Sequence, residues 1–204
     1  YRKLLTKLPP QHIEIQNFIN TLTTNKTDFF REPQHFKYIQ DILIPEWINS
    51  RKKSINIWCC ATSSGEEAYS LSLLLNKYLP HSISFQILAT DINTIVLDKA
   101  RNGVYSLSKL NEIPSEYHSI GIVMGEKHLS NWFKINNKIQ KNIIFKKYNL
   151  TGHNPPENVL FDIVFCRNVL IYFSSDTIKS LMIRIHASLK QDDLLFIVNT
   201  ESIQ

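Results

Sequence analysis

Short apolar runs alternate with amphipathic segments along most of the chain, beginning near residue 55. The apolar runs predict five strands, at residues 55–60, 85–90, 145–149, 160–166 and 194–199. Segments whose apolar positions recur at helical spacing predict three helices, at residues 66–78, 94–101 and 174–189. Strands and helices that alternate in this way favour an α/β fold with a doubly wound, mostly parallel sheet and helices on both faces.

A helical pattern precedes the alternating region. Residues 1–23 resemble the end of a helical region, which Pro9-Pro10 interrupts. Residues 32–48 predict a further helix, because the fixed φ of Pro33 suits a first helical turn. The apolar residues at helical spacing are predicted to form its buried face: Phe36, Ile39, Leu43 and Trp47.

Residues 106–142 do not fit the alternation, because they are too many for a plain connection between a helix and a strand. The apolar stretches 132–135 and 139–144 flank the polar pair Asn136-Asn137 and predict two short strands. We therefore expect a helix-plus-β insertion at the side of the main sheet.

Composition sets limits on this picture. The 204 residues are 43% hydrophobic, which is enough for one sizeable core, and the net charge of +5 selects no particular class of partner. The sequence contains neither an apolar run of membrane-spanning length nor a signal-peptide pattern, so we expect a cytoplasmic protein that is not integral to a membrane. Cys59, Cys60 and Cys166 lie in apolar runs and are expected to be buried free thiols. No His pairs with another His or Cys at ligand spacing, so no metal site is predicted.

Polar residues stand at four successive strand ends, where open α/β sheets bind ligands. Each of them alone has an ordinary explanation in turn chemistry. Together they indicate a nucleoside ligand: the turn at residues 63–67, Thr90-Asp91, Asn149-Leu150, and Arg167-Asn168 followed by Tyr172.

The turn at residues 63–67 also indicates the charge of that ligand. Glu66 and Glu67 open the helix after the first strand and occupy the positive end of its dipole. Two carboxylates repel a pyrophosphate but suit a ligand that carries an amine and no phosphate, such as S-adenosylmethionine. The alternative is that both acids merely cap the helix.

Four ordered motifs, spread over about residues 21–203, resemble the chemotaxis receptor glutamate O-methyltransferases. Residues 24–32 read Thr-Asn-Lys-Thr-Asp-Phe-Phe-Arg-Glu and are similar to that family's Thr-Asn-x-Thr-x-Phe-Phe-Arg-Glu signature. Residues 64–70, 89–105 and 165–173 resemble its glycine turn, its second-strand block and its fourth-strand block. The resemblance implies a class I, Rossmann-like enzyme. Such an enzyme transfers methyl groups from S-adenosylmethionine to glutamate side chains on the helical cytoplasmic region of chemoreceptors, and releases S-adenosylhomocysteine.

The resemblance also implies a role for individual residues. Asn25, Thr27 and Arg31 would lie over the cofactor, while Gly65 belongs to the turn beneath it. Glu66 would bind the methionine amine and Asp91 the ribose. Adenine would contact Asn149 and Leu150, and the methionine part would contact Asn168 and Val169. Arg31 and Tyr172 would face the methyl group and the incoming glutamate as the catalytic pair.

This chemistry is internally consistent, because a carboxylate that attacks a sulfonium methyl is already the nucleophile and needs no general base. The site must supply alignment and a dry pocket. The competing interpretation of Arg31 is a surface ion pair with Glu32 or Asp28. The competing interpretation of Tyr172 is an aromatic residue at the start of a helix that packs on the core.

The resemblance divides the chain into a remnant of an amino-terminal helical domain (1–23), a linker and helix covering the cofactor site (24–52), and the methyltransferase domain (53–204). The insertion falls at about 106–142, and the family's last strand would lie beyond Gln204. Ala61 replaces a frequent glycine and could tighten the pocket. We expect a monomer.

Two other functions compete with this one. Residues 154–157, Asn-Pro-Pro-Glu, resemble a motif of adenine methyltransferases, but they precede the fourth strand, and Glu157 replaces the aromatic residue that would stack on a base. We therefore expect no nucleic-acid partner. The second competitor is a cofactor-binding signalling module without turnover, against which Arg31 and Tyr172 both argue.

Overall fold

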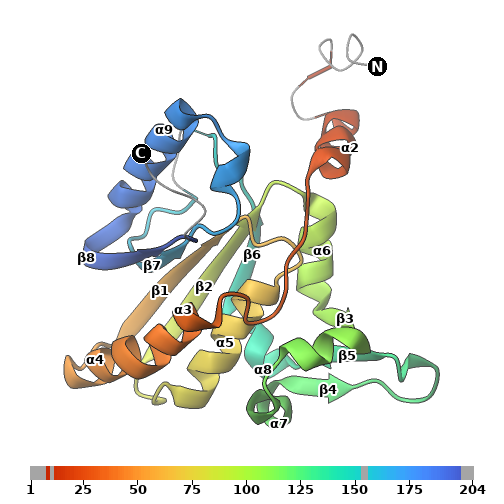
Figure 1. The fold of residues 1–204 in the computed structure, drawn as a ribbon, viewed down its shortest axis with the longest axis vertical. Coiled ribbons are helices and arrows are strands. Elements are labelled where there is room, and N and C mark those ends of the chain that lie inside the picture. Colours follow the sequence, from red (N-terminus) through yellow and green to blue (C-terminus); the bar gives the residue numbers. More distant parts are fainter. Residues whose placement is uncertain (1–7, 10–11, 153–155, 199–204) are drawn as a thin grey trace.

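The centre of the molecule is a five-stranded sheet in which all neighbouring strands are parallel, in the order β6-β2-β1-β7-β8 (Figure 1). The computed structural model describes residues 8–9, 12–152 and 156–198. The strands are β1 (Ser54–Cys60), β2 (Ser84–Asp91), β6 (Ile143–Lys147), β7 (Phe161–Phe165) and β8 (Leu189–Phe196). The predicted doubly wound α/β fold is confirmed. β8 begins five residues before its predicted start, and residue 199, its predicted end, lies outside the described residues.

Helices cover both faces of this sheet. On one face lie α5 (Glu66–Tyr78) and a continuous helical segment made of α3 (Pro33–Tyr38), a π-helical turn (Ile39–Leu43) and α4 (Ile44–Asn49). The opposite face carries α9 (Ser175–Ser188), which packs on Trp58 and Cys60 through Leu181 and Ile185. Because side chains alternate along a strand, the residues of β1 divide between the two cores.

Two further helices complete the framework of the site. α6 (Thr94–Asn102) follows β2, and α2 (Ile13–Leu22) stands on its amino-terminal end. Gln16 Nε2 donates to the Ile92 carbonyl at 3.0 Å, and Asn20 Oδ1 accepts from the Thr94 N–H at 3.1 Å. The chain then runs from α2 past the upper edge of the sheet to α3 (Figure 1). The predicted burial of Phe36, Ile39, Leu43 and Trp47 along that helical segment is confirmed.

The insertion forms a separate antiparallel sheet in the order β3-β5-β4, at the lower right of Figure 1. Its strands are β3 (Val104–Ser106), β4 (Ile122–Met124) and β5 (Trp132–Ile135). Its short helices are α7 (His118–Gly121), α8 (Asn137–Gln140) and 3₁₀ turns at Leu107–Glu112, Ser115–Tyr117 and Lys127–Leu129.

One predicted element of the insertion is wrong. The strand expected at residues 132–135 is present as β5, but residues 139–144 do not form its partner. The Asn136 side chain accepts from the Ile139 N–H at 3.1 Å and caps α8 instead. Ile143 and Ile144 pair with β2 of the main sheet. Capping chemistry and long-range pairing therefore overrode the local apolar pattern.

The three cysteines are buried free thiols, as predicted. In the part of the chain that the structure describes, no helix is long and apolar enough to cross a membrane. Within the same residues, no cluster of three or more His, Cys, Asp or Glu side chains could hold a metal ion.

Candidate functional site

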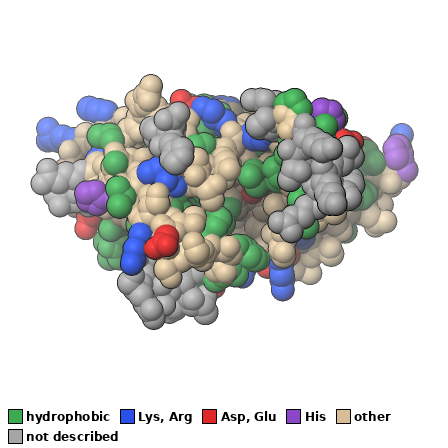
Figure 2. All heavy atoms as spheres, turned by 90° about the horizontal axis from the view of Figure 1, so that it is seen from above, with side chains coloured by type: hydrophobic (Ala, Val, Ile, Leu, Met, Phe, Trp, Pro, Cys, Tyr) green, Lys and Arg blue, Asp and Glu red, His purple; other side chains and the backbone are tan. Residues whose placement is uncertain are grey.

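A cavity of about 320 Å³ opens at the edge of the sheet where the parallel strands end. Figure 2 looks onto this edge, and the Lys and Arg side chains in its coloured part are dispersed rather than gathered in one patch. Residues 22–27, at the end of α2 and the start of the linker, form one wall of the cavity, and the turn at 61–63 after β1 forms another. The remaining lining residues are Arg31, Glu67, Asp91, Ile92, Arg167, Asn168, Val169, Tyr172 and Phe173.

The structure brings most of the predicted site residues together here: Asn25, Thr27, Arg31, Asp91, Asn168, Val169 and Tyr172. Gly65, Glu66, Asn149 and Leu150 lie near the same edge of the sheet but are not part of the lining. Leu150 is buried in the apolar cluster against which Val169 and Phe173 pack. Asn149 is exposed after β6, and its Oδ1 accepts from the Thr151 N–H and hydroxyl at 3.0 and 2.9 Å.

The turn between β1 and α5 has an unusual backbone. Ala61 and Ser63 have left-handed φ values of 51° and 52°, and Gly65 has a φ of 94°. A Cβ on Gly65 would lie 2.9 Å from the Cβ of Ala100 on α6, so this position needs glycine both for conformation and for close packing. Gly65 thus lets α5 approach α6 and fixes the turn that lines the cavity.

Asp91 holds this turn in place from the end of β2. Its Oδ2 accepts from the Ser63 N–H at 2.8 Å, and its Oδ1 accepts from the Asn93 N–H at 2.9 Å. Burial raises the pKa of this carboxyl, and the backbone hydrogen bonds oppose that shift. Because an ionised carboxylate accepts about four hydrogen bonds, Asp91 keeps capacity for the hydroxyl groups of a ligand.

The two adjacent glutamates at the start of α5 point to different partners. Glu66 is 1% exposed, accepts from Ser64 Oγ at 2.8 Å and pairs with Lys109 Nζ at 3.2 Å. Burial is the main cause that raises the pKa of Glu66, and Lys109 opposes it. Glu67 faces the cavity and accepts from Arg167 Nε at 2.7 Å. In the sequence both acids indicated a ligand with an amine, but the resemblance assigned an individual role to Glu66 and none to Glu67.

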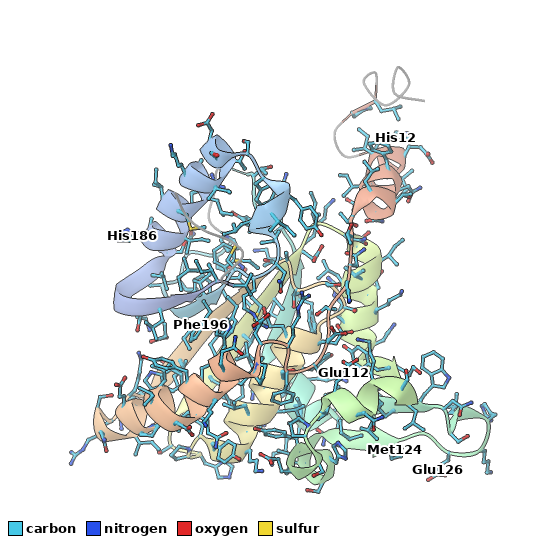
Figure 3. All side chains as sticks on the ribbon, in the orientation of Figure 1. His12, Glu112, Met124, Glu126, His186 and Phe196 are labelled. Carbon is cyan, nitrogen blue, oxygen red and sulfur yellow. The ribbon has the colours of Figure 1, made fainter. Side chains whose placement is uncertain are left out.

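The linker is fastened to the insertion beside this cluster. Lys109 Nζ donates to the Thr27 carbonyl at 2.8 Å and lies 3.6 Å from Asp28 Oδ1. Glu112, labelled in Figure 3, accepts from the Phe29 N–H at 2.9 Å. The insertion therefore holds the wall of the cavity that contains Thr27, a function that the sequence did not suggest.

Arg31 carries a cationic side chain at the cavity wall. Its Nη1 donates to the Lys26 carbonyl at 3.4 Å. Its neighbouring acids are engaged elsewhere, since Glu32 accepts from Gln34 at 2.7 Å and Asp28 pairs with Lys109. No ion pair of Arg31 occurs among the residues that the structure describes. The competing interpretation of Arg31 as half of a surface ion pair is therefore wrong.

Tyr172 ends a 3₁₀ turn (Leu170–Tyr172) that follows β7. Tyr172 is 58% exposed, whereas Leu170 of the same turn is buried in the core. Asn168, which begins this segment, has a left-handed φ of 58°, a conformation that asparagine tolerates better than most residues. Tyr172 therefore lines the mouth of the cavity and is not an anchor in the core.

Thr62, one of the residues that line the cavity, has a buried hydroxyl without a partner in the described chain. Thr62 is 2% exposed, and its Oγ1 makes no hydrogen bond to any residue that the structure describes. A buried hydroxyl without a partner is costly, so a bound group or a water that reaches Thr62 Oγ1 would be favoured there. Together with the Asp91 carboxylate and the apolar Val169 and Phe173, Thr62 gives the cavity the mixed lining that a nucleoside with an alkyl chain requires.

Comparison with known proteins supports this interpretation. A family model described as CheR methyltransferase, SAM binding domain, matches residues 25–204. The chain is 34% identical over 200 residues to a chemotaxis protein methyltransferase of Borreliella burgdorferi, covering 95% of this chain and 70% of that protein. It is 36% identical over 200 residues to a chemotaxis protein methyltransferase of Salmonella typhimurium, covering 93% of this chain and 64% of that protein.

A solved structure resembles the fold at low sequence identity. The crystal structure of the glycopeptide N-methyltransferase MtfA complexed with sinefungin aligns with a TM-score of 0.50 at 11% identity. The alignment covers 92% of this chain and 60% of that chain. At this identity the similarity shows the fold alone.

The parallel sheet, the cavity at its carboxyl edge and the acid that ends β2 are the arrangement in which open α/β sheets bind nucleosides, and the matching family model makes this an S-adenosylmethionine-dependent methyltransferase domain. The chain belongs to the CheR methyltransferase family. The predicted enzyme class, a protein-glutamate O-methyltransferase of chemotaxis that uses S-adenosylmethionine, is thereby confirmed.

Proposed function

We propose that this chain methylates glutamate side chains in the helical cytoplasmic region of chemoreceptors and that the cavity at the sheet edge is the active site. The observation that carries this proposal is the Arg31 guanidinium, a cation without an ion pair among the described residues, at the wall of that cavity. A guanidinium binds a carboxylate through two parallel hydrogen bonds, which suits a glutamate substrate.

Bound S-adenosylmethionine supplies an electrophilic methyl group. Arg31 would orient the incoming glutamate, and Tyr172 at the mouth would position its carboxylate. The substrate carboxylate is already ionised, so no residue is assigned as a general base. The linker wall, with Asn25 and Thr27, would exclude water from the cavity.

The remaining predicted residues are proposed as the cofactor site. Asp91 would bind the ribose hydroxyls, Leu150 and Asn149 would lie against adenine, and Asn168 and Val169 would flank the methionine part.

Glu66 retains its proposed role toward the methionine amine on one condition. Lys109 already occupies its carboxylate, so the amine would have to share Glu66 with this lysine. Gly65 contributes through the shape of the turn.

We further propose that residues 1–23 belong to an amino-terminal helical domain, that 24–52 cover the cofactor site and that 53–204 form the methyltransferase domain. The protein would act as a cytoplasmic monomer. The nucleic-acid alternative has little support. Pro156 and Glu157 are held by Lys146 Nζ at 2.8 and 2.6 Å on the side of the chain before β7. Asn154 and Pro155 lie outside the described residues.

The test combines binding with turnover. Calorimetric titration with S-adenosylhomocysteine should give saturable one-to-one binding, and labelled methyl groups should pass from S-adenosylmethionine to a receptor helical fragment. Arg31→Gln should abolish most of the transfer and leave S-adenosylhomocysteine binding within about threefold of the parent, because the lost bonds are those to glutamate.

Three results would contradict the proposal. Binding of cofactor and receptor without transfer would indicate a signalling module. Transfer to DNA oligomers but not to receptor fragments would indicate a nucleic-acid enzyme. Failure of a folded sample to bind S-adenosylhomocysteine would remove the cofactor site itself.

A further inference from the structure

The Arg167 guanidinium joins three elements beneath the linker. Its Nε donates to Glu67 Oε2 at 2.7 Å, and its Nη1 donates to the Arg31 carbonyl at 2.7 Å. The same Nη1 lies 3.2 Å from His35 Nδ1, which must accept because arginine only donates. The Arg167 side chain is 3% exposed.

Two aromatic rings fix the plane of this guanidinium. Its central carbon lies 5.6 Å from the ring centre of Phe36 and 5.3 Å from that of Phe165. One ring belongs to α3 and the other to β7, so packing as well as hydrogen bonding determines where the nitrogens of Arg167 point.

The backbone segment that Arg167 binds contains residues with energetically unfavourable φ values. Phe30 and Glu32, on either side of Arg31, have left-handed φ values of 49° and 58°. Residues other than glycine keep such φ values only where the surrounding structure holds them. Ser70 Oγ accepts from the Phe30 N–H at 2.9 Å, and Arg167 binds the Arg31 carbonyl. The peptide group after the Arg31 Cα and the peptide group before the Phe30 Cα are thus fixed from outside the linker.

We propose that Arg167 is a positioning residue for methyl transfer: it holds the Arg31 carbonyl, between the strained residues Phe30 and Glu32, so that the Arg31 guanidinium is aimed into the cavity. This inference rests on the proposed function of Arg31. Arg167 Nε and Nη1 are bound to protein groups, and Arg167 has no assigned contact with substrate. A lysine could not replace it, because one ammonium cannot reproduce the fork that reaches Glu67 and the Arg31 carbonyl from separate nitrogens.

The first test is Arg167→Lys in the full-length protein, which keeps the charge opposite Glu67. We expect kcat for a receptor helical fragment to fall about 10- to 100-fold, the loss typical of a misplaced catalytic group. The Kd for S-adenosylhomocysteine should stay within about threefold of the parent.

The matched control is Arg101→Lys. Arg101 also combines an ion pair, with Asp98 at 2.7 Å, and a bond to a backbone carbonyl, that of Phe145 at 3.1 Å, but it lies outside the cavity lining. The control should keep the parent kcat.

A kinetic double-mutant cycle separates positioning from a general structural effect. If Arg167 acts through Arg31, adding Arg167→Lys to Arg31→Ala should change kcat by less than about twofold. If the kcat losses of the two single variants multiply in the double variant, the inference is overturned. A parent-like kcat in Arg167→Lys would also overturn it. The thermal midpoint of each variant is measured alongside, and it should not follow the changes in kcat.

If Arg167→Lys does not fold, the pair Glu67→Gln with Arg167→Met replaces it, since this pair removes both buried charges and keeps apolar packing against Phe36. The same loss of kcat is expected, again absent in the Arg31→Ala background. Absence of transfer by the parent protein would overturn the proposed function together with this inference. Transfer by the parent with no loss in either Arg167 variant would overturn this inference alone.

Discussion

Glu67 and Arg167 form a buried ion pair that joins the first turn of α5 to the segment after β7. Their side chains are 12% and 3% exposed, and Arg167 Nε lies 2.7 Å from Glu67 Oε2. Both residues line the cavity, and they follow two of the strand ends from which the site is built. Arg167 also donates to the Arg31 carbonyl, so this one side chain connects the sheet, α5 and the linker.

Breaking this pair should destabilise the fold. Glu67→Gln leaves the Arg167 charge buried without a carboxylate, so we expect the free energy of unfolding to fall by about 1–3 kcal/mol. Urea denaturation measures this change. Glu157→Gln is the control, because Glu157 and Lys146 are each 44% exposed and such pairs contribute only about 0–1 kcal/mol. Equal losses in the two variants would show that burial of the Glu67 pair is irrelevant.

The Thr62 hydroxyl provides a test of ligand fit. Thr62→Val keeps the shape of the side chain and removes the buried Oγ1 that has no partner in the described chain. The variant should be as stable as the parent or more stable by about 1 kcal/mol without ligand, and should bind S-adenosylhomocysteine about 2- to 10-fold more weakly. Thermal unfolding and calorimetry give the two numbers. Unchanged affinity would mean that the ligand does not reach Thr62.

Asp91 is predicted to bind the ribose. Asp91→Asn keeps an acceptor for the Ser63 N–H but loses the second carboxylate oxygen, so S-adenosylhomocysteine affinity should fall about tenfold or more. Asp98→Asn, on the exposed side of α6, is the control and should bind as the parent does. Parent-like affinity in Asp91→Asn would refute the ribose assignment.

In the turn after β1, two small substitutions should change the free energy of unfolding by very different amounts. Gly65→Ala combines a φ of 94° with a Cβ placed 2.9 Å from Ala100, and should cost about 2–5 kcal/mol of unfolding free energy. Ala61→Gly relieves a left-handed alanine at the price of a more flexible unfolded chain, and should change stability by less than about 1 kcal/mol. Chemical denaturation of both variants checks this. A mild effect of Gly65→Ala would show that α6 moves aside readily.

His35 should make stability depend on pH. Burial, followed by the charge of Arg167, lowers the pKa of His35 in the folded protein. Below about pH 6.5 the unfolded chain therefore binds the proton more readily than the folded chain, and stability is lost as the pH falls. Glu66 and Asp91 also titrate, so the comparison is the parent against His35→Asn. The stability advantage of the parent should shrink as the pH falls from 7 toward 5, and a constant difference would exclude this role for His35.

Much of the fold follows from local pattern. Near-continuous apolar runs predict buried parallel strands, and β1, β2 and β7 lie within a residue or two of their expected bounds. The helix predicted at residues 174–189 is also present as α9, which Ser174 caps by accepting from the Thr177 N–H at 3.4 Å. The insertion could not be predicted correctly, because residues 139–144 carry an apolar pattern that fits a hairpin strand, a helix or a sheet edge. Their partners on β2 lie far away in sequence.

The site shows the same division. Polar residues at strand ends gather in space because parallel strands end at one edge of the sheet, so Asp91, Asn168 and Tyr172 could be placed from sequence. Which of Glu66 and Glu67 faces the cavity could not be predicted from the sequence. Adjacent helical residues point about 100° apart, and which one meets the cavity depends on how α5 rotates against the sheet.

The sequence by itself determined the α/β class, the family and the edge of the sheet that carries the chemistry. These properties are encoded in periodicity, in turn residues and in motifs contiguous along the chain. Only the tertiary structure decided that Lys109 holds Glu66, that Thr62 Oγ1 has no partner in the described chain and that Arg167 grips the Arg31 carbonyl. Each of these depends on contacts between distant segments, which no local pattern specifies.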